Sequence, residues 1–122
     1  MIKLANEIRT ERLVLRLADK ADYVYRIYEK TGHDKPIGNV TLGILEGWFF
    51  EDEIVVKIDK PFRANGYAKE AVIALKDHAI SCGITPWARA WRWDKGGNAL
   101  ALKTGFVLSK KGLLENTYKL DL

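Results

Sequence analysis

The segment Asp59–Ala68 carries the residue types of an anion-binding site. It follows an apolar run that ends at Ile58 and precedes a predicted helix. The first N–H groups of a helix have no partner within the helix, and the helix dipole favours negative charge there, so a phosphate can bind. Gly66 permits close backbone approach, and Arg63 adds a forked donor. An ordinary loop with an incidental glycine remains the alternative, because neither phosphate-loop glycine signature is present.

A second candidate is the aromatic segment Trp87–Trp93, in which tryptophan, alanine and arginine alternate. At strand spacing, Trp87, Arg89, Trp91 and Trp93 share one face. Aromatic rings interleaved with arginine can stack on nucleotide bases. The more ordinary interpretation is that the tryptophans form core or a subunit interface, with the alanines making room for a helix.

Hydrophobic periodicity predicts the elements that position these segments. Ile8–Leu17 alternates as a strand does, and Asp19 opens a predicted short helix that ends at Gly32, with Tyr23, Val24, Ile27 and Tyr28 at helical spacing. A second helix, Ala68–Ser81, has the clearest apolar stripe and is stopped by Gly83. The other predicted elements are strands at Ile37–Leu45 and Phe50–Ile58 joined by a hairpin at Gly47, a strand at Ile84–Trp93, a helix at Asn98–Thr104 ending at Gly105, and one or two strands in Phe106–Leu122.

This order, β-α-β-β-α-β-α-β, predicts an α+β fold on a mostly antiparallel sheet. The chain of 122 residues has no linker-like segment and no repeat, so we expect residues 1–122 to form a single domain. It is mildly basic, with a net charge of +4, but its basic residues are scattered. One cysteine, Cys82, excludes an internal disulfide and a cysteine metal cluster, and we expect no metal. No apolar run is long enough to span a bilayer and the opening residues lack a signal-peptide pattern, so we expect a cytoplasmic protein.

The loop and its surroundings resemble a known family. Arg63-Ala64-Asn65-Gly66-Tyr67-Ala68 is similar to the Arg/Gln-x-x-Gly-x-Gly/Ala signature of the GNAT superfamily of N-acetyltransferases. Ile8–Arg16 resembles the opening strand of its ribosomal-protein N-acetyltransferase-like branch, Glu53–Arg63 its fourth strand and turn, Ala68–Ala71 the helix start, and Lys103–Phe106 the motif near the C-terminal helix. These pieces occur in the family's order and span most of the chain.

The resemblance implies a GNAT-like mixed sheet, flanked by helices, whose central strands splay to admit acetyl-CoA as co-substrate. The family's loop binds the pyrophosphate, which carries over to Arg63, Ala64, Asn65, Gly66, Tyr67 and Ala68. The preceding strand pairs with the pantetheine arm, which maps to Val56, Lys57 and Ile58. Asn98 lies near the family's helical asparagine and is a further cofactor-binding candidate.

The implied reaction is direct attack of a primary amine on the acetyl thioester, and the amine needs a base. Glu53 is the catalytic candidate because it opens the strand that leads into the loop; a solvated carboxylate is the alternative. His33 is a second candidate base, whereas His78 reads as a packed or surface residue. The position of the family's usual tyrosine acid is Ala101 here.

The chain is shortened where the family builds its acceptor-side wall, because only Thr31–Pro36 separate the first predicted helix from the next strand. We therefore expect an open acceptor cleft, suited to a protein N-terminus, a lysine or a small-molecule amine, or one completed by a second subunit as a homodimer. The alternative function is a non-catalytic acyl-CoA-binding or RNA-binding module on a degenerate acetyltransferase fold. We expect neither a membrane nor a nucleic-acid partner.

Overall fold

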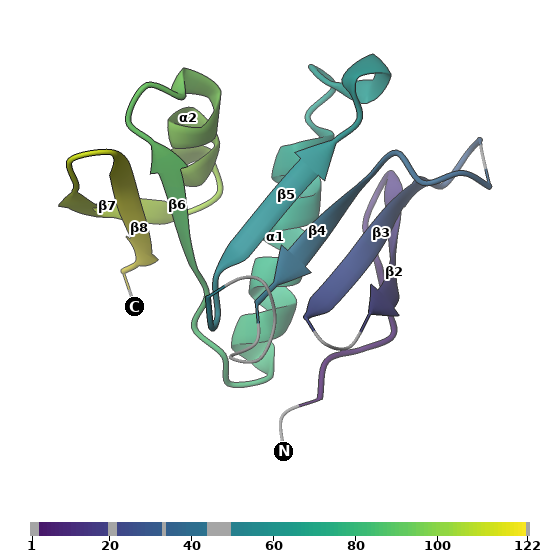
Figure 1. The fold of residues 1–122 in the computed structure, drawn as a ribbon. Helices are drawn as coiled ribbons and strands as arrows, with labels where there is room; N and C mark the ends of the chain where they lie inside the picture. Colours follow the sequence, from purple (N-terminus) through teal and green to yellow (C-terminus); the bar gives the residue numbers. More distant parts are fainter. Residues whose placement is uncertain (1–2, 20–21, 33, 44–49, 122) are drawn as a thin grey trace.

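A computed structural model describes residues 3–19, 22–32, 34–43 and 50–121, and contains two antiparallel sheets. The first has five strands that neighbour one another in chain order: β1 (Glu7–Arg9), β2 (Leu13–Asp19), β3 (Tyr23–Glu29), β4 (Gly38–Leu42) and β5 (Ile54–Ile58). The second has the order β6-β8-β7, formed by β6 (Trp87–Trp91), β7 (Phe106–Lys111) and β8 (Glu115–Leu120) (Figure 1). The predicted α+β class with mostly antiparallel strands is confirmed.

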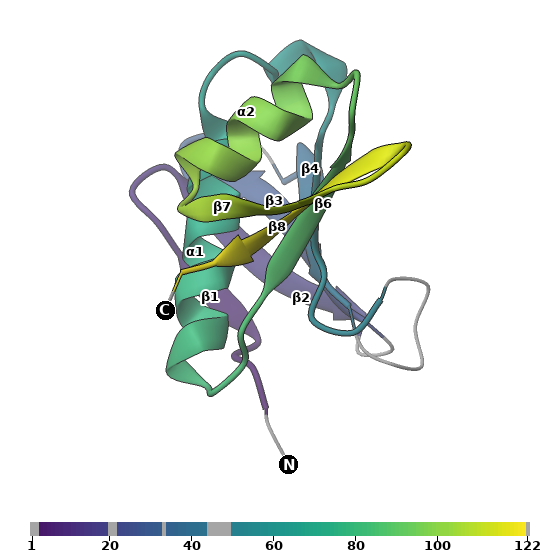
Figure 2. The ribbon, with the colours of Figure 1, turned by 90° about the vertical axis from the view of Figure 1, so that its left-hand side faces the viewer.

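Two helices cover these sheets. The longer one, α1 (Tyr67–Ser81), runs along the five-stranded sheet, and α2 (Lys95–Lys103) crosses above β7 (Figure 2). A short 3-10 turn, η1 (Lys60–Phe62), connects β5 to the loop before α1. The stripe predicted on the long helix is its buried face, which consists of Ala71, Val72, Leu75 and Ala79. These side chains complete one core with both sheets, because Phe106 and Tyr118 of the second sheet belong to the same buried cluster.

The predicted helix after Asp19 is wrong, because that segment is strand β3. Helical spacing and strand spacing both fit its apolar residues, and pairing with β2 decides between them. Leu15 lies opposite Ile27 and Leu17 opposite Tyr25, so β3 buries Tyr25 and Ile27 while Arg26 between them stays exposed. Aromatic and β-branched side chains favour this pleated surface.

The predicted first strand is two strands. The chain turns at residues 10–12, so that Ile8 on β1 pairs with Leu15 on β2. The strands predicted around residues 37–45 and 50–58 and in the tail are confirmed, as are both later helices, with ends shifted by a few residues. The hairpin predicted at Gly47 lies outside the described residues. Strand β2 ends at Asp19 and β3 begins at Tyr23, so the segment predicted as a helix is occupied by β3 from residue 23 on.

Strands β5 and β6 join the two sheets and then diverge. Glu53, just before β5, forms a single parallel bridge with Trp87 at the start of β6. Beyond this bridge the two strands separate, and Figure 1 shows them opening as a V. The splayed central strands implied by the resemblance are therefore present.

The described helices include none that is both long enough and apolar enough to cross a membrane. The sequence predicts that the tryptophans form core or a subunit interface. Trp91 is 51% and Trp93 66% exposed, so these two are not core residues of the chain, and an interface stays a prediction for them. Their rings stack on each other, with centroids 5.4 Å apart.

Candidate functional site

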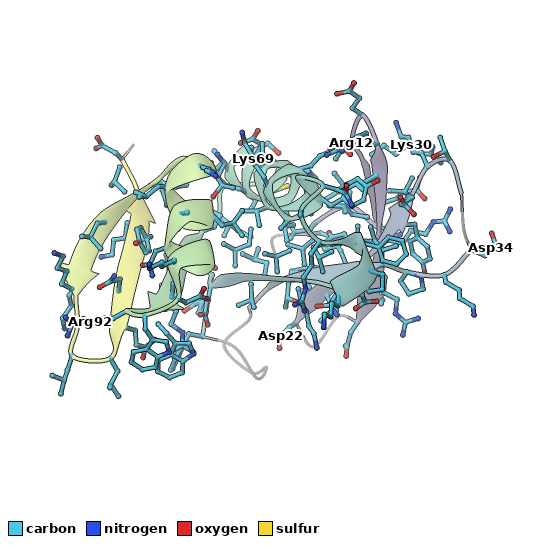
Figure 3. The ribbon with its side chains drawn as sticks, turned by 90° about the horizontal axis from the view of Figure 1, so that it is seen from above. Arg12, Asp22, Lys30, Asp34, Lys69 and Arg92 are labelled. Atoms are coloured by element: carbon cyan, nitrogen blue, oxygen red, sulfur yellow. The ribbon has the colours of Figure 1, made fainter. Side chains whose placement is uncertain are left out.

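One cleft, of about 310 Å³, lies over the N-terminal end of α1. Its walls come from the end of β5, the loop predicted to bind phosphate, the first turn of α1, and one side of α2. The charged residues that line it are all basic: Arg63, Lys69 and Lys103. In Figure 3, which looks down on this end of the molecule, Lys69 lies on the side of α1 nearest α2, and Arg12 on the opposite side. The loop therefore opens into a basic cleft.

The N-terminus of α1 has no side-chain cap. Gly66 occupies the N-cap position with φ +78°, and no N-cap side chain bonds to the backbone N–H groups of the first turn. Ala64 also has a positive φ, of 65°, which a residue with a Cβ adopts at a cost in strain. The backbone N–H groups of Tyr67, Ala68 and Lys69 have no acceptor within the helix. Donors left open in this way beside three basic side chains fit a phosphate.

The loop is fastened to the β1–β2 turn by Arg12. Its Nη1 donates to the Asn65 carbonyl at 2.9 Å, its Nε donates to Glu70 Oε1 at 2.7 Å, and its guanidinium carbon lies 4.5 Å from the centre of the Tyr67 ring. Glu70 Oε2 accepts from Thr10 Oγ1 and from the Arg12 backbone N–H. Burial raises the pKa of the Glu70 carboxyl, but these hydrogen bonds outweigh burial and lower it. Tyr67 adds a bond to Glu29 at 2.8 Å.

Two loop side chains are used to shape the loop. Arg63 Nε donates to the Ile58 carbonyl at 2.7 Å, and Asn65 Nδ2 donates to the Phe62 carbonyl at 3.1 Å. Arg63, Ala64, Gly66, Tyr67 and Ala68 line the cleft, whereas Asn65 does not. The predicted phosphate-binding loop is thus brought together as one surface, with backbone amides as its open donors.

The edge of β5 that faces β6 offers backbone groups along the V. Gly43 donates to the Glu53 carbonyl, and Asp59 donates to the Ile37 carbonyl, each at 2.8 Å. Bonded pairs alternate along an antiparallel ladder, so the backbone groups of Val56 and Ile58 face away from β4. The backbone N–H and C=O groups of Lys57 face Asn39 on β4. Of the three predicted pantetheine-binding residues, Val56 therefore offers its N–H and C=O groups to the groove, and Ile58 offers its N–H, because the Ile58 carbonyl already accepts from Arg63 Nε.

A second cleft, of about 380 Å³, lies between β5, β6, α2 and β8, and shares Leu100 with the first. Glu53 lines it and is only 2% exposed. Glu53 Oε2 accepts from Arg89 Nε at 2.6 Å, and Arg89 Nη1 reaches Glu115 Oε2 at 3.2 Å. Glu53 Oε1 is buried without a hydrogen-bond partner. A buried carboxylate oxygen without a partner can accept a hydrogen bond or a proton from a molecule that reaches it.

Asn98 lies beside the second sheet, not in either cleft. Its amide donates to the carbonyls of Trp91 and Asp94, and its oxygen accepts from Asn116 and Tyr118. These bonds use the whole side chain to hold α2 against β6 and β8. Ala101 is buried and lines the second cleft, and none of the described residues that line it is a tyrosine.

The two histidines do not enter the site. His33 lies outside the described residues. His78 Nε2 accepts from the Ala5 backbone N–H at 2.9 Å, which ties the N-terminal segment to α1. His78 is predicted to be a packed or surface residue, and this bond together with its half-buried position agrees with that prediction.

Sequence reasoning missed Arg12, Glu70 and Arg89, which hold the site in shape. Arg12 and Glu70 are 58 residues apart, and Arg89 and Glu53 are 36 apart. No local spacing links either pair, because each forms only when distant strands and helices meet.

Comparison with known proteins places the fold. No protein-family model and no curated protein matches the sequence. An acetyltransferase from Agrobacterium tumefaciens superimposes with a TM-score of 0.81 at 18% identity, covering 100% of this chain and 98% of that one. A GNAT-family acetyltransferase from Bacillus anthracis has a TM-score of 0.74 at 15% identity, covering 92% of this chain and 96% of that one. The ribosomal-protein acetyltransferase RimL, in complex with coenzyme A, also has a TM-score of 0.74 at 15% identity, covering 94% and 98%. The chain has the fold of the GNAT acetyltransferases.

Proposed function

We propose that this protein transfers an acetyl group from acetyl-CoA to a primary amine. The observation that carries the proposal is the uncapped N-terminus of α1 opening into a cleft whose only charges, among the residues described, are three cations. A diphosphate would satisfy the open amides and the cations together. Two solved structures with this fold hold coenzyme A or acetyl-CoA, in RimL and in the self-immunity acetyltransferase MccE.

The rest of the donor follows the open V. With the pyrophosphate at residues 63–68, the pantetheine arm would run beside β5 and bond to the backbone of Val56 and Ile58. The thioester would then lie toward the closed end of the V, where Glu53 bridges to Trp87. Holding two reactants in register in this way can supply roughly 7–11 kcal/mol of the barrier reduction.

Glu53 is the proposed catalytic base. The neutral amine would attack the thioester carbonyl carbon, so that a C–N bond forms and the C–S bond breaks. The proton lost by the amine nitrogen would go to Glu53 Oε1, the oxygen without a partner. The sulfur would leave as a thiolate, since no described tyrosine lines the cleft to protonate it, and solvent would supply that proton.

The direct test is mass spectrometry of a panel of amines and peptides after incubation with the protein and acetyl-CoA. We expect a product heavier by one acetyl group that is absent when heat-inactivated protein is used. Stabilisation of the fold by acetyl-CoA without any acetylated product would support the non-catalytic acyl-CoA-binding alternative instead.

A further inference from the structure

The second cleft is acidic in a basic protein. The chain has a net charge of +4, yet the cleft is lined by three carboxylates, Glu53, Asp94 and Glu115, and by one guanidinium, Arg89, for a net formal charge of −2. Arg92, the next arginine along the chain, does not line the cleft, and its Nη1 donates to the Leu113 carbonyl at 3.2 Å. Figure 3 labels Arg92 at the side of the molecule formed by the second sheet.

The buried end of this cleft needs a hydrogen-bond donor. Glu53 Oε1 is buried without a partner, and the Arg89 guanidinium already spans Glu53 Oε2 and Glu115 Oε2. A buried carboxylate oxygen without a donor is costly, and an amine N–H supplies one. A carboxylate-bearing molecule would place like charge beside it. The unpartnered oxygen therefore favours a hydrogen-bond donor such as an amine over an anion at this end.

The mouth of the cleft offers a second cation site. Asp94 and Glu115 lie at its rim, Asp94 exposed and Glu115 with a side chain 38% exposed. Trp91 is 51% exposed on the same cleft, and its ring stacks on the ring of Trp93. Carboxylates next to a rigid indole attract an ammonium group by ion pairing and by cation–π interaction.

We propose that the acceptor is an amine that carries a second positive charge, with the reacting nitrogen at Glu53 and the second cation held between Trp91, Asp94 and Glu115. This inference rests on the proposed acetyl transfer and adds the class of the acceptor. It accounts for a cleft that carries both an unpartnered buried carboxylate oxygen and an acidic, aromatic rim.

The test compares three acceptors of equal chain length that differ only in the far end: putrescine, n-butylamine and gamma-aminobutyrate. With the wild-type protein we expect kcat/KM to fall in that order, with putrescine favoured over n-butylamine by roughly fivefold or more. Equal values, or a preference for n-butylamine, would overturn the inference while leaving acetyl transfer in place. Transfer to none of the three, when another amine or peptide of the panel is acetylated, would overturn this inference alone. The absence of an acetylated product from every acceptor tested would contradict both proposals.

Asp94→Asn isolates the charge, because asparagine is as good an N-cap as aspartate and keeps an acceptor for the Gly97 N–H. We expect the ratio of kcat/KM for putrescine to that for n-butylamine to fall about two- to fivefold. Asp77→Asn is the matched control, since Asp77 is 65% exposed on α1 and lines neither cleft. If the putrescine to n-butylamine ratio of kcat/KM were unchanged in Asp94→Asn, or fell equally in Asp77→Asn, the proposed site for the second cation at this rim would be contradicted.

Discussion

The two clefts share one wall residue, Leu100, but are built in opposite ways. The cleft over α1 is lined by three cations and no described anion, and its specific donors are backbone amides. The cleft at Glu53 has a net formal charge of −2, and its specific groups are side chains from the residue before β5, from β6 and β8, and from the N-cap of α2. One end suits a diphosphate and the other an amine.

The difference extends to the two helix N-termini. Asp94 caps α2 by accepting from the Gly97 N–H at 2.9 Å, whereas Gly66 leaves α1 uncapped. A carboxylate at the N-cap of α2 satisfies donors that α1 leaves open for a ligand. The cleft over α1 thus depends on backbone shape, whereas the cleft at Glu53 depends on charge and side-chain chemistry.

The largest effect should come from Glu53→Gln at the acidic end. The amide keeps the shape of the side chain but cannot take the proton from the amine, so we expect kcat to fall by roughly a hundredfold or more. Stabilisation by acetyl-CoA should persist, which separates catalysis from donor binding. A kcat within about threefold of wild type, with the same pH–rate profile, would remove Glu53 from the chemistry.

Gly66→Val should weaken acetyl-CoA binding at the cleft over α1. Valine is strained at the positive φ of residue 66, and its branched side chain would keep a phosphate away from the backbone, so we expect acetyl-CoA affinity to fall at least about tenfold, or ~1.4 kcal/mol. Gly83→Val is the matched control: Gly83 has φ +88° at the other end of α1, and nothing lies within 4 Å of an added Cβ. Titration calorimetry should show normal affinity in the control, even if both variants lose similar stability. Equal affinities in the two variants would refute the loop assignment.

Glu70→Gln tests the hydrogen bonds and the ion pair that join the first turn of α1 to the β1–β2 turn. The folded-state pKa of Glu70 is lowered, so its carboxylate contributes stability above its ordinary pKa that is lost as pH falls through the lowered value. We expect the variant to lose about 1–2 kcal/mol in the free energy of unfolding at neutral pH, and the difference to shrink below about pH 4.5. Urea unfolding at several pH values measures this. Glu11→Gln, in the β1–β2 turn that carries Arg12, serves as the control. If the loss of unfolding free energy in Glu70→Gln did not change with pH, the ion-pair account would be contradicted.

The smallest effect should come from Lys103→Gln, which removes one of the three cations that line the cleft over α1. An exposed cation contributes about 0.2–1 kcal/mol, so we expect acetyl-CoA affinity to fall by up to about fivefold. The difference should narrow as ionic strength rises. Lys119→Gln, which lines neither cleft, should leave the affinity unchanged. If acetyl-CoA affinity fell as much in Lys119→Gln, the effect would be one of net charge alone, not of a cation in the cleft.

The cleft over α1 could be predicted from the sequence more fully than the cleft at Glu53. Residues 59–68 are contiguous, so the loop and the start of α1 were readable from local pattern. Tyr23–Glu29 was not, because its apolar residues fit both periods and only pairing with β2 makes it a strand. The Glu53–Arg89–Glu115 chain of hydrogen bonds joins three distant strands, so sequence could suggest Glu53 without its partners. Asn98 lay close to the family pattern, but its bonds hold α2 to the second sheet.

The most direct measurement is thermal unfolding with acetyl-CoA and, in parallel, with acetyl-pantetheine, which lacks the pyrophosphate. A ligand that binds only the folded state at about a hundred times its Kd adds about 2.7 kcal/mol of stability. We predict that acetyl-CoA raises Tm by several degrees and that acetyl-pantetheine at the same concentration has little effect. No shift with millimolar acetyl-CoA, or equal shifts with both ligands, would contradict a pyrophosphate site at the N-terminus of α1.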